Sequence, residues 1–358
     1  MSNHEASPGS INILRAQFNE ISVENLFKKY SEIGFLYPEK LKILLPFIEQ
    51  IKQNWQKLNS SPEELLWILS INDHYNDGFA SVSVIKQSNY GLLAQHLVSN
   101  GNPYLSLKVM LDAQYRAEHL HTEDEVRSSQ NWFRPNNRYA YRVFSTMYKK
   151  IGNQAAFINS YDYLHLNVES ILPYQSDRYR TEEVTGVDDD LIEFVKSEYS
   201  NVFVKAEELD QKDIILNTLN DKYKKYNLSR YRRISKVIDT ETNSIIACVI
   251  ANRSPLGLNF SFLENRCYYI TQSSLKEPEL LYVLAVMNNY AAQIYEDFAL
   301  GSVPIVTDAA TSSSLQKLGA NFIRIYVQSI WLREGFSQWY EHIESFLAKI
   351  ESRFREVA

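Results

Sequence analysis

Residues 148–152 read YKKIG and residues 315–319 read LQKLG, so a helix-like run that ends at a glycine occurs twice. The two glycines lie 167 residues apart. An apolar run rich in β-branched and aromatic residues follows each glycine, at 157–166 and at 322–331. A glycine directly after a helical run is a common signal for the end of a helix. Repetition over this distance predicts two related domains.

Two further matches lie upstream of these segments. Residues 80–85 read ASVSVI and residues 247–252 read ACVIAN, again 167 residues apart. A Gly-Leu pair comes next in each copy, beginning at Gly91 and at Gly257, which are 166 residues apart. The nearly constant offset leaves room for about one inserted residue, so we expect the same order of elements in both copies.

Length and composition set the class of protein. A chain of 358 residues corresponds to about two domains, and 45% hydrophobic residues are enough for two ordinary cores. A net charge of −6 argues against a surface for DNA or for anionic membranes. Neither a signal core at residues 1–10 nor an apolar run of the roughly 18 residues that span a membrane is found. Cys248 and Cys267 lie in apolar contexts and are expected to be buried free thiols, which favours the cytoplasm.

Hydrophobic periodicity predicts the elements of each copy. In the first copy we expect helices at 23–30, 38–58, 104–119 and 138–150, strands at 65–71, 79–85, 91–98 and 157–166, and a short strand exit at 132–135. In the second copy we expect helices at 188–199, 213–226, 279–298, 312–318 and 335–355, and strands at 231–238, 244–251, 258–263, 267–271, 302–306 and 322–331. Helices before a three-strand meander, then helix, strand, helix and strand, predict an α/β (α+β) fold.

The domain boundaries follow from breaks in these patterns. We expect a flexible leader at 1–20, a first domain at 21–172, a polar linker at 173–190 and a second domain at 191–358. Each domain is predicted to be a mixed, mostly antiparallel sheet flanked by helices.

This order of elements, with the Tyr148-x-x-Ile-Gly152 ending, resembles the GNAT superfamily of N-acyltransferases in both halves. In that family the second helix commonly reads Asn-x-x-Ala-x-x-x-Tyr-x-x-Leu-Gly-Phe. Here Tyr141 and Phe144 stand where Asn and Ala are typical, and Leu315 replaces the tyrosine in the second copy. The resemblance implies two tandem GNAT-like domains, of which the second is degenerate.

The donor loop departs from the family. GNAT enzymes hold the diphosphate of CoA with a Gln/Arg-x-x-Gly-x-Gly/Ala loop, whose backbone N–H groups and helix N-terminus form an anion site. The corresponding residues of the first copy are Ser99, Asn100, Gly101 and Asn102, with one glycine. Residues 273–278 of the second copy contain no glycine. If CoA binds, the resemblance therefore places it in the first copy.

Three residues are candidates for catalysis. Tyr148 matches the position of the tyrosine that protonates the leaving thiolate in the family, although it can equally be a helix residue that packs on the sheet. His96 is a candidate base because its ordinary pKa is near neutral, with a half-buried strand histidine as the alternative. Glu118 is a weaker candidate base, and an exposed glutamate at a helix end is its alternative.

Basic residues suggest a second kind of ligand. Arg134, Arg138 and Arg142 recur every four residues and would form one stripe on a helix, where they could hold a phosphate group. Residues 230–233 read RYRR and form a similar cluster in the second copy. A nucleotide, cyclic dinucleotide or phosphopantetheine ligand would suit such clusters, and plain solvated or salt-bridged arginines are the alternative.

A metal site is not expected. His119 and His121 precede a run of carboxylates at 123–125, but they lie in a predicted helix end and loop without discrete ligand spacing. A solvated loop is the simpler interpretation.

The resemblance leads to two hypotheses, which differ in whether the protein is an enzyme. The first is an N-acyltransferase that moves an acyl group from a CoA or acyl-carrier-protein thioester to a small-molecule or peptide amine. The second is an inactive GNAT-fold binding or regulatory protein, with a nucleotide or cyclic dinucleotide as a ligand. Fold alone does not decide between them. The acceptor, the acyl chain length and the oligomeric state are not specified by the sequence.

Overall fold

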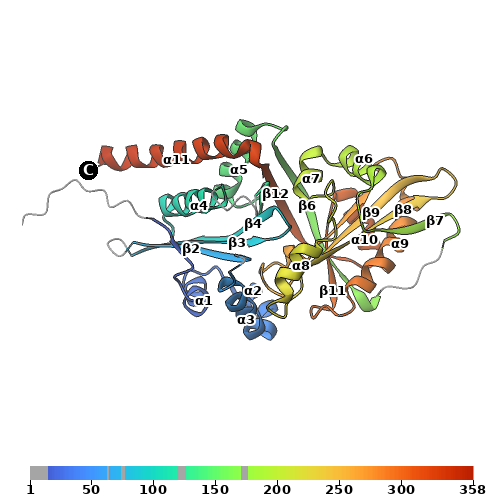
Figure 1. The fold of residues 1–358 in the computed structure, drawn as a ribbon, viewed down its shortest axis with the longest axis horizontal. Coiled ribbons are helices and arrows are strands. Elements are labelled where there is room, and N and C mark those ends of the chain that lie inside the picture. The colour runs from blue at the N-terminus through green and yellow to red at the C-terminus, as the bar shows by residue number, and fades with distance from the viewer. Residues whose placement is uncertain (1–14, 63, 74–76, 119–125, 171–175, 358) are drawn as a thin grey trace, which may run out of the picture.

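The computed structural model describes residues 15–62, 64–73, 77–118, 126–170 and 176–357. It is a mixed α/β structure with one continuous sheet of 12 strands, in the order β1-β2-β3-β4-β5-β12-β6-β11-β10-β9-β8-β7. Helices flank this sheet (Figure 1). Among the described residues, no helix is long and apolar enough to cross a bilayer.

The first half contributes six strands to the sheet. Its strands are β1 (Gln17–Phe18), β2 (Leu66–Asp73), β3 (Gly78–Lys86), β4 (Gly91–Ser99), β5 (Ser128–Phe133) and β6 (Ala156–Asn167). Its helices are α1 (Val23–Glu32), α2 (Pro38–Leu44), α3 (Ile48–Asn59), α4 (Pro103–Glu118) and α5 (Arg138–Ile151). Helices α1, α2 and α3 cover one face of β2–β4, and α4, α5 and α11 cover the other (Figure 1).

The second half contributes the other six strands. Its strands are β7 (Tyr179–Val184), β8 (Tyr231–Asp239), β9 (Ser244–Arg253), β10 (Cys267–Thr271), β11 (Ser302–Thr307) and β12 (Asn321–Leu332). Its helices are α6 (Asp189–Glu198), α7 (Asn201–Ala206), α8 (Asn217–Lys224), α9 (Glu277–Tyr295), α10 (Ala309–Lys317) and α11 (Phe336–Val357).

The two halves exchange their last strands. β12 of the second half lies between β5 and β6 of the first and pairs with both in antiparallel fashion. β6 of the first half lies between β12 and β11 and pairs antiparallel with β11. Each half therefore completes its sheet with a strand from the other, and the backbone hydrogen bonds of the centre belong to both halves.

The repeat predicted from the sequence is largely confirmed. Gly152 and Gly319 end α5 and α10 with φ of +84° and +93°, the left-handed backbone that favours glycine. Both are followed by a long strand, β6 or β12. Both cysteines are buried and free, as expected.

The expected strand at 258–263 is wrong. This segment forms turns, and β10, which begins at Cys267, is the third strand of the second meander. Gly91 at the start of β4 and Cys267 at the start of β10 lie 176 residues apart, so the offset grows here. The extra residues form a connection at 254–266 that we call the β9–β10 connection.

Other expectations also need correction. The expected flexible leader, 1–20, is described from residue 15 onward, and this part contains β1, which pairs with β2. The expected linker contains β7, an edge strand that pairs with β8. Helix α7 had not been expected, and α8 begins later than predicted. The domain boundaries themselves stay a prediction.

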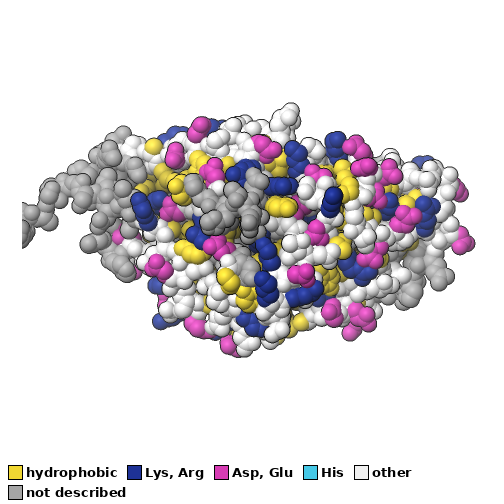
Figure 2. Space-filling view, in the orientation of Figure 1, with side chains coloured by type: hydrophobic (Ala, Val, Ile, Leu, Met, Phe, Trp, Pro, Cys, Tyr) yellow, Lys and Arg dark blue, Asp and Glu magenta, His cyan; other side chains and the backbone are white. Residues whose placement is uncertain are grey.

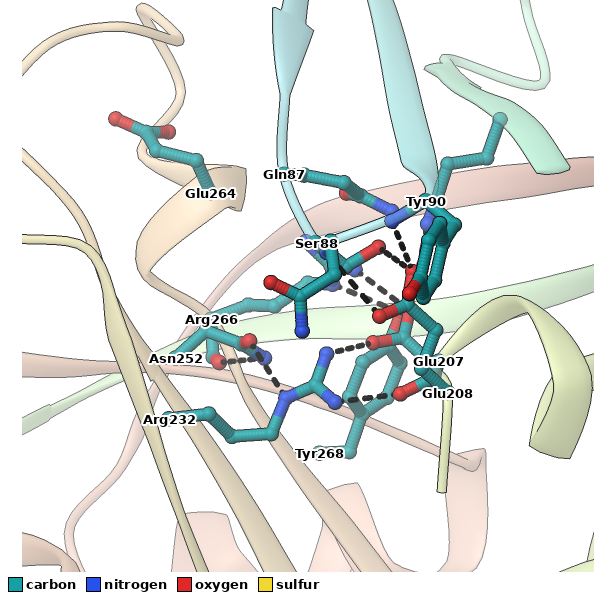
Figure 3. Close-up of polar contacts among 12 residues, drawn as sticks. Gln87, Ser88, Tyr90, Glu207, Glu208, Arg232, Asn252, Glu264, Arg266 and Tyr268 are labelled. Atoms are coloured by element: carbon teal, nitrogen blue, oxygen red, sulfur yellow. Dashed lines mark hydrogen bonds and ion pairs between the residues drawn. The ribbon is translucent and has the colours of Figure 1, made fainter. Parts of the chain in front are cut away.

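A buried network of charges joins the two halves (Figure 3). The Glu207 carboxylate pairs with Arg232 at 2.8 Å and with Arg266 at 3.0 Å, and all three side chains are 1% exposed. Gln130 of β5 donates to Glu207 and accepts from Gln328 of β12. The network therefore connects β8 and the start of β10 with β5 and β12.

The neighbouring Glu208 makes the second connection between the halves. Its carboxylate accepts hydrogen bonds from the Ser88 hydroxyl at 2.7 Å and from the backbone N–H groups of Asn89 and Tyr90. These donors lie in the β3–β4 turn of the first half. Glu264 lies nearby with its carboxylate turned away from the network (Figure 3), and burial raises its pKa to about 7.

We predict that Glu207→Ala strongly destabilises the protein, because the substitution leaves two buried guanidinium groups without their carboxylate. The expected loss in the free energy of unfolding is about 3–5 kcal/mol. The control is Glu183→Ala, which removes a half-exposed partner of Arg233 and should cost at most about 1 kcal/mol. Denaturant unfolding of both variants measures the difference, and equal losses would contradict a special role for Glu207.

Candidate functional site

The sheet of the first half opens where β4 and β5 diverge. The two strands pair in parallel over four positions, from Gly91 opposite Ser128 to Ala94 opposite Asn131. Beyond Ala94 both strands continue, but no further pairing between them is present in the described residues. A cavity of about 730 Å³ lies at this divergence.

Both faces of the sheet contribute to the cavity wall. Met110 of α4 and Phe144 of α5 line it on one face, and Phe35 of the α1–α2 connection lines it on the other. Phe260 of the β9–β10 connection joins Phe35 on that second face. The cavity therefore passes between the strands and has one end on each side of the sheet. We call these ends the α4 end and the α2 end.

His96 occupies a bulge in β4. Its φ of +50° is unusual for a non-glycine residue, and the β3–β4 register shifts between Ser81 and Ser83, opposite this point. The imidazole stacks on Phe260 with 4.2 Å between ring centroids and on Trp55 with 5.4 Å. At the bulge His96 lines the cavity, and the rings of Phe260 and Trp55 hold its imidazole in place.

Both ring nitrogens of His96 are already bonded. Nε2 accepts the backbone N–H of Phe260 at 3.2 Å, so the proton of the neutral ring lies on Nδ1, 3.2 Å from the Ser83 hydroxyl. Burial, and then the charge of Lys40, holds the pKa of His96 well below its ordinary value. The lone pair that a general base needs is occupied in this structure. The catalytic role of His96 stays a prediction, while its contacts show that it positions the bulge.

The β9–β10 connection docks on the first half beside His96. Trp55 donates its indole N–H to the Gly257 carbonyl at 2.9 Å, and Gln95 donates to the Leu258 carbonyl at 2.6 Å. Gly257 has φ of +76°, and a Cβ there would lie 2.3 Å from Ile51 Cγ1, so only glycine fits. The second half therefore supplies part of the cavity wall.

The four predicted donor-loop residues have different positions. Ser99 and Gly101 line the cavity. Asn102 caps α4, because its Oδ1 accepts the N–H groups of Tyr104 and Leu105. Asn100 accepts from the N–H of Phe79, at the start of β3, and does not line the cavity. The start of α4 thus lies at the α4 end of the cavity, with part of its anion-binding capacity used by its own cap.

Tyr148 and Glu118 do not line the cavity. Tyr148 lies near the end of α5, half-buried, whereas Tyr139 near the start of that helix does line it. Glu118 ends α4 beside Tyr340 of α11. Their catalytic roles stay predictions. The sequence analysis does not single out Tyr139, because this residue lies outside the Tyr148-x-x-Ile-Gly152 ending. Its buried hydroxyl is close to Ser106 at the α4 end.

The expected arginine stripe is not formed. Helix α5 begins after its cap, Asn137, so Arg138 and Arg142 lie exposed on the helix and Arg134 precedes it. Arg134 instead donates to the Tyr37 hydroxyl at the α2 end of the cavity. No role for Arg138 or Arg142 in binding follows from their positions.

The basic cluster of the second half is used internally. Arg230 and Arg232 are buried and donate to backbone carbonyls and to Glu207, and Arg233 pairs with Glu183. This cluster therefore offers no free phosphate site. Figure 2 shows acidic and basic side chains interspersed on this face of the molecule. The candidate metal residues His119, His121 and 123–125 lie outside the described residues. Among the residues that the structure does describe, no group of side chains could hold a metal ion.

Side chains close the equivalent position in the second half. The Thr307 hydroxyl of β11 donates to the Tyr269 carbonyl of β10 at 2.9 Å, and the hydroxyls of Thr271 and Thr311 lie 3.2 Å apart. At the start of α9, Glu279 accepts the N–H of Lys276. A carboxylate at a helix N-terminus competes with any phosphate there. These contacts occupy the position that corresponds to the cavity of the first half, and the lack of CoA binding by the second copy stays a prediction.

Comparisons with known proteins give likenesses of fold only. No family model and no curated protein matches the chain. Similar solved structures include a tandem GNAT protein from the clavulanic acid biosynthesis pathway, with 8% identity, 78% of this chain and 87% of that chain covered, and a TM-score of 0.39. A GCN5-related N-acetyltransferase from Sphaerobacter thermophilus has 10% identity, coverages of 79% and 85%, and a TM-score of 0.38.

Saccharomyces cerevisiae N-myristoyltransferase with bound myristoyl-CoA is a third similar structure. It has 11% identity, covers 91% of this chain and 81% of its own, and gives a TM-score of 0.40. At such scores the likenesses assign no function to the chain, and the chemistry of the cavity has to be inferred from its own residues.

We predict that His96 and His165 each lower the stability as the pH drops from 7 to 5. Glu264 and Glu208, whose pKa values burial raises, act in the opposite direction, so the histidine contribution is read from the difference between the wild type and a histidine variant. Burial lowers the pKa of His96 well below its ordinary value and that of His165 to about 4. Below pH ~6.5 the unfolded chain binds protons that the folded histidines do not, so each histidine removes up to about 1.4 kcal/mol per pH unit in this window. Urea unfolding at several pH values measures the slope. His165→Gln should reduce it, and an unchanged slope would contradict the burial argument.

Proposed function

We propose that the first half is an N-acyltransferase site, in which the cavity between β4 and β5 holds an acyl thioester of CoA or of a carrier protein. The passage through the sheet is the observation that supports this proposal. Beyond Ala94, β4 has no partner strand on its β5 side among the described residues, so its backbone groups can pair with an extended chain of amides. Pantetheine is such a chain.

The size and lining of the cavity suit an acyl thioester. A volume of about 730 Å³ falls in the range of small-molecule sites. Apolar side chains such as Leu92, Met110 and Ala113 supply walls for an acyl chain. The two ends allow two substrates to meet, with the donor entering at the α4 end and the amine at the α2 end.

The reaction is direct attack of the amine nitrogen on the thioester carbonyl. A C–N bond forms, the C–S bond breaks, the nitrogen loses a proton and the sulfur gains one. Tyr139 lines the cavity at the α4 end, and its phenol, which is protonated at neutral pH, is the proposed proton donor to the leaving thiolate. Tyr148 is the residue that the resemblance assigns to the same role, and the two assignments are distinguishable.

A binding protein without turnover is the second candidate function. The cap that Asn102 places on α4 supports it, because two N–H groups that could receive a phosphate are already bonded. The absent glycine-rich loop points the same way. A nucleotide or cyclic dinucleotide would then be a ligand rather than a substrate.

We expect a bulky side chain at Ala94 to block the donor. Ala94→Phe places a ring where β4 and β5 separate and should weaken acyl-CoA binding at least about 10-fold, since the ring fills space that the ligand needs. Ala292→Phe on α9, which does not line the cavity, is the matched control. Calorimetric titration with acetyl-CoA and a long-chain acyl-CoA measures the dissociation constants. If the wild type binds neither, CoA-dependent transfer is ruled out.

A pair of tyrosine variants identifies the proton donor. Tyr139→Phe should lower kcat about 100-fold or more with little change in acyl-CoA affinity, because only the proton transfer is lost. Tyr148→Phe should act at near wild-type rate. Release of free thiol from an acyl-CoA reports the rate, and both cysteines of the chain are buried. Loss of activity in Tyr148→Phe alone would restore the assignment from the resemblance, and tight binding without thiol release would favour the second candidate function.

A further inference from the structure

Three cationic side chains surround Tyr37 at the α2 end of the cavity. Lys40 Nζ lies 5.3 Å from the centroid of the Tyr37 ring, and Arg134 Cζ lies 5.2 Å from it. Arg324 donates to the Tyr37 hydroxyl at 3.2 Å, and Arg134 donates to the same oxygen. Lys40 also lies over the ring of Phe35, at 3.9 Å from its centroid. We call Tyr37, Lys40, Arg134 and Arg324 the cationic cluster.

The cationic cluster has no anionic partner. Within the part of the chain that the structure describes, no carboxylate lies at ion-pair distance from Lys40, Arg134 or Arg324. Burial, and then repulsion from the two arginines, lowers the pKa of Lys40 to about 7. Gathering partly buried like charges is unfavourable, so a bound anion would stabilise this arrangement.

Regular elements of the fold, β12 and α2, place Arg324 and Lys40. Arg324 follows a bulge in β12, where the pairing with β6 shifts between Phe322 and Arg324. A bulge redirects the side chains that follow it. Tyr326, two residues further along β12, lines the same cavity. Tyr37 directly precedes α2, and Lys40 lies in the first turn of this helix.

The cationic cluster is also distinct from the donor loop. Helix α2, which contains Lys40 and follows Tyr37, lies on one face of the sheet, whereas Ser99 and Gly101 lie in the connection from β4 to α4, and α4 is on the other face (Figure 1). A donor that enters at the α4 end leaves the α2 end for the second substrate. An anion held here therefore belongs to the acceptor in the proposed reaction.

We propose that the cationic cluster binds a carboxylate or phosphate group of the amine acceptor, so that the acceptor class is acidic amines. This inference rests on the proposed function. The paired arginines supply directed donors for an oxyanion, and Lys40 supplies a further charge. The phosphate groups of CoA have the same chemistry, and the experiments must separate the two sources.

The first experiment measures anion binding without any transfer reaction. Calorimetric titration with sodium sulfate and with sodium acetate, at constant ionic strength, should show one saturable site in the wild-type chain. Lys40→Met and Arg324→Met should weaken binding at least about 10-fold, since each removes a charge-assisted contact. Arg324→Lys should recover part of the affinity. Lys42→Met, an exposed residue on the same helix, is the control. Absence of a saturable site, or equal loss in Lys42→Met, would overturn the proposal.

A second readout is proton uptake. Arg134, Arg324, Tyr37 and His96 face Lys40. Burial raises the pKa of Tyr37, but the hydrogen bonds and charges of the two arginines outweigh this effect and leave that pKa lowered. Sulfate at pH 7.5 should raise the proton occupancy of Lys40, because the anion opposes the repulsion of the arginines. The binding heat should then depend on the ionisation heat of the buffer. This dependence should vanish in Lys40→Met, and its persistence there would exclude Lys40 as the group that takes up the proton.

The third experiment separates acceptor from donor. Matched amines with and without the anion, phosphoethanolamine against ethanolamine and 4-aminobutyrate against butylamine, are compared in the thiol-release assay. The acidic member should have the higher kcat/KM, by about 10-fold or more, and Arg324→Met should remove this preference by raising KM. The acyl-CoA dissociation constant should stay unchanged in Arg324→Met.

The outcomes distinguish this inference from the proposed function. A weaker acyl-CoA affinity in Arg324→Met, with no change in acceptor preference, would assign the cationic cluster to the donor and overturn the inference. Turnover with equal preference for neutral amines would overturn it as well while leaving the proposed function intact. If no acyl-CoA binds, the proposed function and the acceptor assignment both fail, and the sulfate titration alone then shows whether an anion site exists.

Discussion

The exchange of β6 and β12 is the constraint on which the rest of the structure depends. Strand β12 reaches the centre of the first half only because it pairs with β5 on one side and with β6 on the other. It carries Tyr326 into the wall of the cavity and Arg324 to Tyr37, which lines that cavity. The hydrogen bonds of β12 join residues that lie far apart in the sequence. The same strand pairing therefore builds the wall of the cavity and joins the two halves.

The two copies use this shared scaffold differently. In the first, β4 and β5 separate and leave a passage. In the second, hydroxyls of Thr271, Thr307 and Thr311 bridge the same region. The longer β9–β10 connection then packs the second half against Trp55 and His96. The second half thus contributes to the wall of the cavity in the first half, while hydroxyl contacts occupy the corresponding position next to β10 and β11.

Local signals made most of the elements predictable from the sequence, but not the composition of the site. The glycines that end α5 and α10 and the periodic helices act over a few residues. The apolar pattern of 258–263 predicts a strand, but the burial that this pattern indicates comes here from contact with the first half rather than from sheet pairing. Tyr37 and Arg324 are 287 positions apart, and no spacing rule connects such residues. Ser99 and Gly101 could be placed because a strand and a helix flank them directly.

The chain treats its buried cations in two ways, and the contrast helps to separate scaffold from site. Arg232 and Arg266 are 1% exposed, share the Glu207 carboxylate and donate further hydrogen bonds to the protein. A guanidinium group satisfied in this way has no capacity left for a ligand. Lys40 and Arg324 are half-buried, and no carboxylate of the described residues lies at ion-pair distance from either; Lys40 lies over the Phe35 ring, and Arg324 donates to the Tyr37 oxygen. Because burial without an opposite charge is costly, selection for stability alone would pair or remove such cations. Lys40 lines the cavity and Arg324 contacts Tyr37, which also lines it, and in the proposed function the opposite charge arrives with the ligand.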